Sequence, residues 1–156
     1  MKRIIPLIII FSIALSTKAI GLEVGKWTFV ETDEYCYIGS LAIETDLPEE
    51  KKRGDNYILV YKNLGAPETV IQIEAGYDYN TEEKINVKID KAEYLFYSTK
   101  DLPSAAWTND DNKVIYAMKK GLKLVISGKS SRGTVTNDTY TLKGFTSSYT
   151  QLLEDC

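Results

Sequence analysis

The chain of 156 residues contains no histidine, the side chain that most often acts as a general base near neutral pH. This absence excludes Ser-His and Cys-His nucleophiles and leaves a zinc site without imidazole ligands. The sequence also lacks a G-x-S-x-G segment and a phosphate-binding loop. We therefore predict a protein that is not an enzyme, with no catalytic, cofactor-binding or metal-binding residues. A serine-lysine or carboxylate mechanism stays open, because no residue pattern selects or rejects it.

Long apolar runs are scarce. The run from Ile4 to Leu15 is shorter than the roughly 20 apolar residues that a membrane-spanning helix needs. It follows the basic Met1-Lys2-Arg3 and precedes a short exit ending at Ala19, which is typical of a secretory signal peptide. We predict a signal peptide at residues 1–19 and a mature domain at residues 20–156. The predicted location is the periplasm or cell envelope, with no integral membrane span after cleavage.

Positive charge is also limited, with 19 Lys and Arg against 22 Asp and Glu and a formal net charge of −3. Cleavage after Ala19 removes Lys2, Arg3 and Lys18, so the mature charge is 16 minus 22, or −6. An acidic domain lacks the basic surface that binds nucleic acid or anionic lipid. We therefore predict no nucleic acid partner, and we interpret the cluster Lys51-Lys52-Arg53 as neutralised by Glu49-Glu50.

Only two cysteines are present, Cys36 and Cys156. In an oxidising compartment an even number of cysteines indicates disulfide bonding. The alternatives are a metal-binding pair and a catalytic thiol, and both lack a histidine partner. We predict a disulfide between Cys36 and Cys156 that ties the C-terminal segment to an early strand.

The residues that are abundant favour β-structure, including 11 Tyr and many Val, Ile and Thr. Alternation of apolar and polar residues is clearest in Ile85, Val87 and Ile89. Polar loops are expected at residues 44–53 and 76–83. Strands are predicted at residues 26–30, 35–43, 57–61, 69–75, 85–89, 92–97, 122–126 and 134–142.

Two segments carry helical periodicity instead. Val114, Ile115 and Met118 form one apolar face, which predicts a helix over about residues 112–120, capped by Asp110-Asp111 and ended by Gly121. A second helix is predicted over residues 146–155, capped by Thr146 or Ser147, and its face ends on Cys156. The fold class is therefore mainly β, a single β-sandwich-like domain with two short helices.

Several segments together resemble the invasion-associated locus B family of exported bacterial proteins. They are GKWTF at 25–29, CYIGS at 36–40, KRGDNYILV at 52–60, AGYDY at 75–79 and the C-terminal block AMKKG…SGKSSRGT…DTYTLKGFTSSYTQLLEDC. The resemblance implies an exported periplasmic or envelope protein with a β-rich fold. In pathogenic relatives it implies a link to the invasion of host cells, red cells especially. It supplies no catalytic residues.

The tripeptide Arg53-Gly54-Asp55 matches a motif that integrins bind on exposed loops. We favour a structural interpretation, a loop-to-strand turn in which Gly54 gives backbone freedom and Arg53 and Asp55 are solvated charges.

A candidate binding surface is predicted from aromatic residues in or beside polar loops, namely Trp107, Tyr77 and Tyr79. Trp27, on an early strand, is expected in the core instead. The oxygen-rich segment 109–112 lacks the spacing of a calcium loop, so we interpret it as a turn and helix cap.

Three functions are considered. The preferred one is a non-enzymatic envelope or periplasmic binding or accessory protein. Its partner is an unknown protein or envelope component, and it has a host-interaction role where the lifestyle of the organism calls for it. The second is a periplasmic structural or chaperone-like factor for envelope proteins. The third is a hydrolase of envelope polymer or glycan, which lacks a catalytic constellation.

Overall fold

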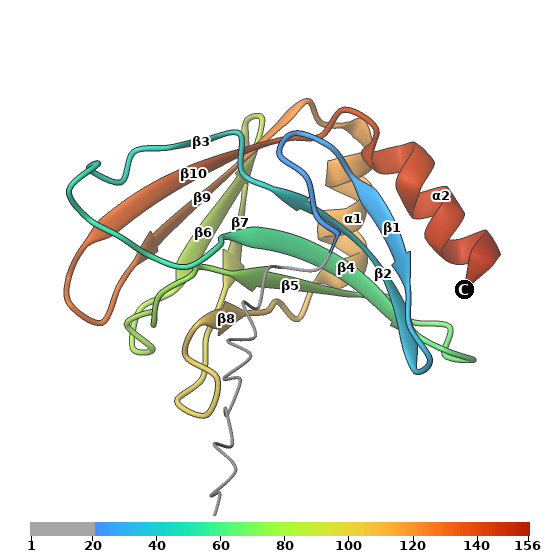
Figure 1. Cartoon of the computed structure of the whole chain (residues 1–156), viewed down its shortest axis with the longest axis horizontal. Helices are drawn as coiled ribbons and strands as arrows, with labels where there is room; N and C mark the ends of the chain where they lie inside the picture. Colours follow the sequence, from blue (N-terminus) through green and yellow to red (C-terminus); the bar gives the residue numbers. More distant parts are fainter. Residues whose placement is uncertain (1–20) are drawn as a thin grey trace, which may run out of the picture.

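Two five-stranded antiparallel sheets make up most of the computed structural model, which describes residues 21–156 (Figure 1). The predicted signal peptide at residues 1–19 lies outside the described residues. The first sheet has the order β1-β2-β4-β5-β8, with bounds Thr28–Glu31, Tyr35–Leu41, Tyr57–Asn63, Val70–Glu74 and Ala105–Ala106. The second sheet has the order β3-β10-β9-β6-β7, with bounds Glu44–Thr45, Val135–Thr141, Lys123–Lys129, Ile85–Ile89 and Ala92–Phe96.

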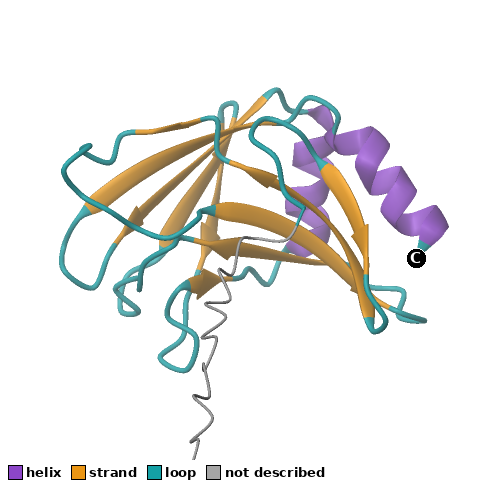
Figure 2. Ribbon diagram, viewed as in Figure 1, coloured by secondary structure: helices purple, strands orange, loops and turns teal. Residues whose placement is uncertain are grey.

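Two helices, α1 (Asp111–Lys120) and α2 (Phe145–Asp155), pack against each other at one side of the sheets (Figure 2). Helix α2 also contacts β1, β2 and β4. Sheets and helices confirm the predicted fold class, mainly β with two helices. No helix in residues 21–156 has the length and apolarity required to cross a membrane.

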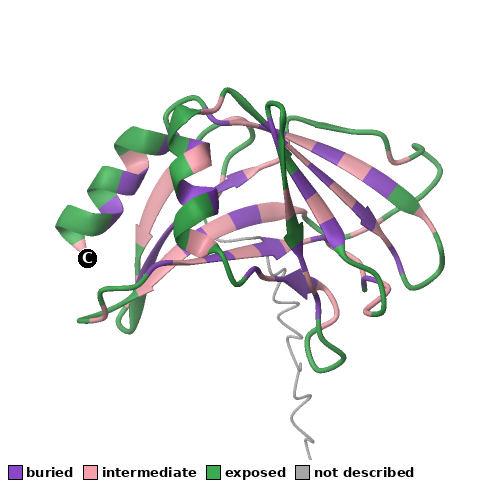
Figure 3. Cartoon of the chain, turned by 180° about the vertical axis from the view of Figure 1, so that it is seen from behind, coloured by how far each residue is buried: buried purple, intermediate pink, exposed green. Residues whose placement is uncertain are grey.

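Alternation of inward and outward side chains along β5, β6, β9 and β10 contributes much of the core, whereas β2 has five consecutive buried residues. Along β9 the buried positions include Leu124 and Ile126, and along β10 they include Tyr140 (Figure 3). Burial of each large apolar side chain contributes about 1.5–3 kcal/mol. The same alternation places Asp138 of β10 on the buried side. A charged residue there requires a partner, which is described below.

Strand β3 lies in the loop expected at residues 44–53, and β8 lies in a segment for which no strand was predicted. Each has two residues, so neither contains a period that a sequence pattern reveals. They form because a neighbouring strand offers an open edge: β3 pairs with β10, and β8 pairs with β5. The register of β3 sets Thr45 opposite Asp138.

The predicted helix caps are wrong in their chemistry. Asp110 is the N-cap of α1 without a capping side-chain bond, and Asp111 Oδ1 instead accepts the backbone N–H of Ile71 at 2.8 Å. Gly144, in the left-handed region, is the N-cap of α2. Thr146 Oγ1 donates to the carbonyl of Lys119 at 3.1 Å and so joins the two helices. Asp111 and Thr146, which the sequence predicted as capping residues, therefore bond to other elements instead of capping their own helices.

Gly121 ends α1 as predicted, but in an extended conformation with φ −83°. A Cβ at this position would lie 2.6 Å from Ile89 Cγ2 and 2.9 Å from Leu142 Cδ1. Close packing against the sheet, rather than a left-handed turn, is therefore the reason for glycine here.

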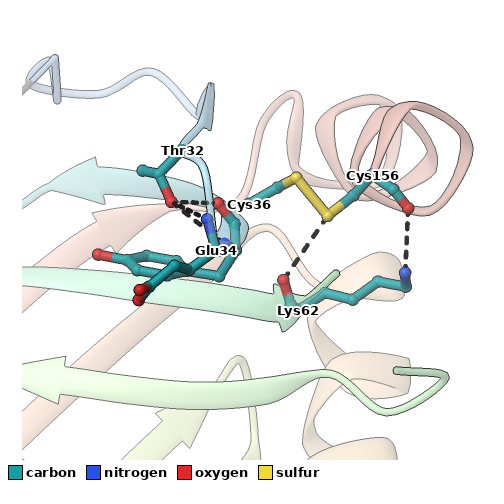
Figure 4. The surroundings of a disulfide bond; sticks show 6 residues. Thr32, Glu34, Cys36, Lys62 and Cys156 are labelled. Atoms are coloured by element: carbon teal, nitrogen blue, oxygen red, sulfur yellow. Dashed lines mark hydrogen bonds between the residues drawn. A yellow bond between two sulfur atoms is a disulfide. The ribbon is translucent and has the colours of Figure 1, made fainter. Parts of the chain in front are cut away.

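The C-terminus is fastened to β2 by the disulfide between Cys36 and Cys156, with a Cα–Cα distance of 5.9 Å (Figure 4). Lys62 Nζ also donates to the backbone oxygen of Cys156 at 3.1 Å. At the nearby turn between β1 and β2, Thr32 Oγ1 donates to the carbonyl of Tyr35 at 2.7 Å. The disulfide and the Lys62 hydrogen bond hold the end of α2 against the first sheet.

Candidate functional site

A basic pocket lies between the loop that follows β3 and the turn that joins β9 to β10. We define it by its lining residues, which come from positions 47–53, 77–78 and 130–134. Both segments stand at the end of the molecule opposite α2 (Figure 1). The volume of about 720 Å³ falls within the usual range for small-molecule sites.

An ion pair between Arg53 and Asp138 underlies the basic pocket. Arg53 Nη1 donates to Asp138 Oδ2 at 2.9 Å, and Nη2 donates to Oδ1. The guanidinium also donates to Thr45 Oγ1 at 3.0 Å and to the carbonyl of Ala75 at 3.4 Å. Both charged side chains are only 6% exposed. The buried side chain of Arg53 therefore links the loop to β10 through its ion pair with Asp138. Its interpretation as a solvated charge is wrong.

The tripeptide at residues 53–55 is thus structural, as expected, but for a different reason. The guanidinium of Arg53 faces inward, which leaves it inaccessible to an integrin-like partner. Gly54 lies against the backbone of Gly76 and donates its N–H to the carbonyl of Gly76 at 2.9 Å. A local charge pattern does not reveal this role of Arg53, because Asp138 lies 85 residues away.

The Gly54–Gly76 contact gives a testable prediction. Gly76 has φ +72°, and a Cβ there would lie 2.2 Å from the carbonyl oxygen of Gly54. We expect Gly76→Ala to lower the free energy of unfolding by about 3 kcal/mol, from left-handed strain and steric overlap together. Urea denaturation of the purified protein measures this.

The matched control is Gly65→Ala. Gly65 has φ +76°, but no heavy atom lies within 4 Å of its Cβ position. It therefore isolates the left-handed strain, about 1 kcal/mol. Equal losses at Gly65 and Gly76 would show that the close approach is unimportant.

Burial alone would lower the pKa of Arg53, but the hydrogen bond and charge of Asp138 outweigh it and raise that pKa. Burial raises the pKa of Tyr77, Tyr79 and Tyr140 above the ordinary tyrosine value. The three hydroxyls therefore stay protonated at neutral pH, where none of them serves as a base.

The structure does not place the three residues of the predicted aromatic surface on one surface. Tyr79 is 3% exposed and belongs to the core, so its assignment to a binding surface is wrong. A backbone bridge between Tyr79 and Ser130 draws the loop inward. The Tyr79 ring then lies so close to Gly128 that a Cβ there would be 2.5 Å from Tyr79 Cε1. Packing of this kind depends on a distant strand, which the polar character of the loop concealed.

Tyr77 and Trp107 are half-buried, and the structure separates them. Tyr77 lines the basic pocket, where its hydroxyl is 2.7 Å from Thr136 Oγ1 and its ring meets Tyr79 edge-on at 5.3 Å. Trp107 is absent from the pocket lining and exchanges two backbone hydrogen bonds of 2.9 Å with Tyr97. Of the three predicted surface residues, only Tyr77 contributes to the basic pocket.

Basic side chains of the rim went unrecognised in the sequence. Lys51 and Lys52 line the pocket, whereas the two glutamates before them do not. Arg132 joins them from the opposite turn. Lys51 Nζ donates to Thr134 Oγ1 at 2.9 Å and connects the two segments. Three cations meet here because the chain folds back across more than 80 residues.

Asp46 fixes the start of the same loop. Its carboxylate accepts the backbone N–H of Asn137 at 2.6 Å and the side-chain Nδ2 of Asn137 at 2.7 Å. These hydrogen bonds to Asn137, its side chain first, hold the pKa of Asp46 below the ordinary value. The loop is therefore tied to two consecutive residues of β10, Asn137 and Asp138.

A second pocket of about 600 Å³ lies between residues 67–70 and 109–113. Burial raises the pKa of Asp111, while the amide of Ile71 opposes that rise. One oxygen of Asp111 is already used by this amide. Within residues 21–156, no three His, Cys, Asp or Glu side chains are grouped to hold a metal ion.

Comparisons with known proteins agree with the fold. The sequence profile of the family described as "Invasion associated locus B (IalB) protein" matches residues 31–153. The crystal structure of invasion associated protein b from Bartonella henselae is similar with a TM-score of 0.59 and 14% sequence identity. The match covers 83% of this chain and 93% of that chain. No curated protein matches the sequence.

Proposed function

The chain belongs to the invasion associated locus B family, and from this premise we propose that it is a non-enzymatic binding or accessory protein of the periplasm or cell envelope. The signal peptide at residues 1–19 directs export and is then cleaved, which leaves residues 20–156 as the mature domain. Its partner is an unknown protein or envelope component, and the basic pocket is where its ligand group enters. A role in host-cell interaction is an extension of this binding in organisms whose lifestyle requires it.

The basic pocket is the observation that carries the proposal. Beneath the pocket, the guanidinium of Arg53 is already hydrogen-bonded to Asp138 and Thr45. This ion pair therefore holds the loop and is not free to bind a ligand. The rim side chains Lys52 and Arg132 are exposed and line the open space. A buried ion pair beneath exposed polar side chains suits recognition of a ligand, because the loop is held in place before the ligand arrives.

Two features support export and the absence of catalysis. The disulfide between Cys36 and Cys156 is of the kind that persists in an oxidising compartment. The chain offers no histidine, and the tyrosine hydroxyls near the pocket have raised pKa values. The chain therefore has no imidazole base, and these tyrosine hydroxyls stay protonated at neutral pH.

Site-specific photocrosslinking in living cells tests this function. A benzophenone amino acid replaces Ser131 at the basic pocket, and in a separate strain it replaces Tyr116 on α1 as the control. Tyr116 is 60% exposed and lies outside the lining. We expect one discrete adduct from position 131, in the periplasmic or envelope fraction, and none from position 116.

Other outcomes contradict the proposal in different ways. A ladder of many adducts from both positions would favour a chaperone-like factor for envelope proteins. An adduct found in the cytoplasm, on a chain that still carries residues 1–19, would refute export. The absence of any adduct from position 131 would refute the pocket as the binding site.

A further inference from the structure

The rim of the basic pocket has a net positive charge, although the chain as a whole has a net negative charge. Lys51, Lys52 and Arg132 contribute three positive charges, and Asp78 contributes one negative charge. Arg53 adds nothing, because Asp138 neutralises it. The local balance is therefore three minus one, or +2, on a chain whose formal net charge is −3.

This balance matches a phosphate monoester, which carries about −1.5 to −2 charges at neutral pH. A carboxylate carries one charge and would leave part of the rim unpaired. An extended polyanion would reach beyond these cations onto a chain whose formal net charge is −3, which disfavours it. A compact dianion thus satisfies both the local charge and the overall charge of the chain.

The remaining lining groups suit a phosphate and the body that bears it. Hydroxyls of Ser131 and Thr134 stand beside the cations as hydrogen-bonding groups. On the other wall, Tyr77 presents an aromatic ring held by Thr136 and by Arg53, whose Cζ is 5.7 Å from the ring centroid. A fixed ring next to polar groups offers a surface for a small amphipathic body.

We propose that the basic pocket binds the phosphate monoester group of a small hydroxyl-rich molecule, through Lys51, Lys52 and Arg132. The proposal rests on the proposed binding function and names the chemistry of its ligand. Two sources supply that chemistry, a soluble sugar phosphate and a lipid whose headgroup ends in a phosphate monoester. The volume of about 720 Å³ accommodates either a sugar phosphate or the headgroup of such a lipid.

Calorimetric titration of the mature, disulfide-bonded protein with glucose 6-phosphate and with glucose tests the charge requirement. We expect binding of glucose 6-phosphate alone, weakened by added sodium chloride because salt screens exposed charges. The double variant Lys52→Gln/Arg132→Gln should bind at least about tenfold more weakly, since each charged hydrogen bond contributes that much or more. Equal binding of both sugars, or of neither, would overturn the proposal.

The control variant is Lys123→Gln/Lys143→Gln, which also removes two charges. Both lysines are exposed; Lys123 begins β9 and Lys143 follows the end of β10, so both lie at the ends of these strands opposite the turn that lines the pocket. Its affinity for glucose 6-phosphate should equal that of the wild type. A loss equal to that of the pocket variant would mean that net charge, not the site, governs binding, and would contradict the proposal.

Vesicle sedimentation separates the two sources. Phosphatidylcholine vesicles with and without phosphatidic acid are mixed with the protein, with glucose 6-phosphate as competitor. Sedimentation that requires phosphatidic acid and is lost in Lys52→Gln/Arg132→Gln supports the lipid source. Calorimetric binding without sedimentation supports the soluble source. If position 131 yields its crosslinked adduct but phosphate binding is absent, the binding function stands and the phosphate assignment fails.

Discussion

Replacing Arg53 by alanine is expected to lower the free energy of unfolding by about 3–5 kcal/mol, because it leaves a buried carboxylate without its partner. Asp138 is 6% exposed and lies among core residues, where an unpaired charge is poorly solvated. The same change removes the bonds to Thr45 and Ala75 that hold the loop. Guanidinium denaturation of the oxidised protein measures the loss.

Two control variants isolate the cause. Arg132→Ala removes an exposed arginine of the same pocket and should change stability by no more than about 0.5 kcal/mol. Arg53→Met combined with Asp138→Leu removes both charges and should recover much of the loss from Arg53→Ala, since no buried charge remains. If Arg53→Ala costs less than about 1 kcal/mol, the pair is solvated and does not hold the loop as described.

Removing the disulfide is expected to cost about 5 kcal/mol. The bond closes a loop with a sequence separation of 120 residues, and in the chain-entropy model a loop of this length restricts the unfolded state by that amount. The double variant Cys36→Ala/Cys156→Ala avoids a stray thiol. Its denaturation midpoint should fall with the secondary structure retained, which circular dichroism checks.

A reductant provides the matched comparison. It should destabilise the wild type to a similar degree and leave the double alanine variant unchanged. Equal stability of the wild type with and without reductant, confirmed by a thiol assay of the reduced protein, would show that the bond does not fasten α2 to the sheet. It would contradict the role given to the C-terminus.

Much of the fold is accessible from the sequence because periodicity is local. Ile85, Val87 and Ile89 alternate, and the structure buries all three on one face of β6. Val114, Ile115 and Met118 repeat with the helical period, and all three lie on the buried face of α1. Such patterns depend only on the geometry of one element.

The pocket was less accessible because it depends on contacts between distant segments. Arg53 finds its partner 85 residues later, and Tyr79 is buried by its approach to Gly128. Neither contact follows from the residues beside it in the chain. One signal was present: Asp138 occupies an inward position in an alternating strand, and a charge there calls for a buried partner.

The most direct test of the account is a nuclear magnetic resonance titration of isotope-labelled mature protein with glucose 6-phosphate. Amide shifts are expected only in the basic pocket, at residues 51–53, 77–78 and 130–134. Amides of α2 and of Trp107 should stay unchanged. Shifts centred on Trp107, or no shifts at all, would contradict the placement of the ligand site.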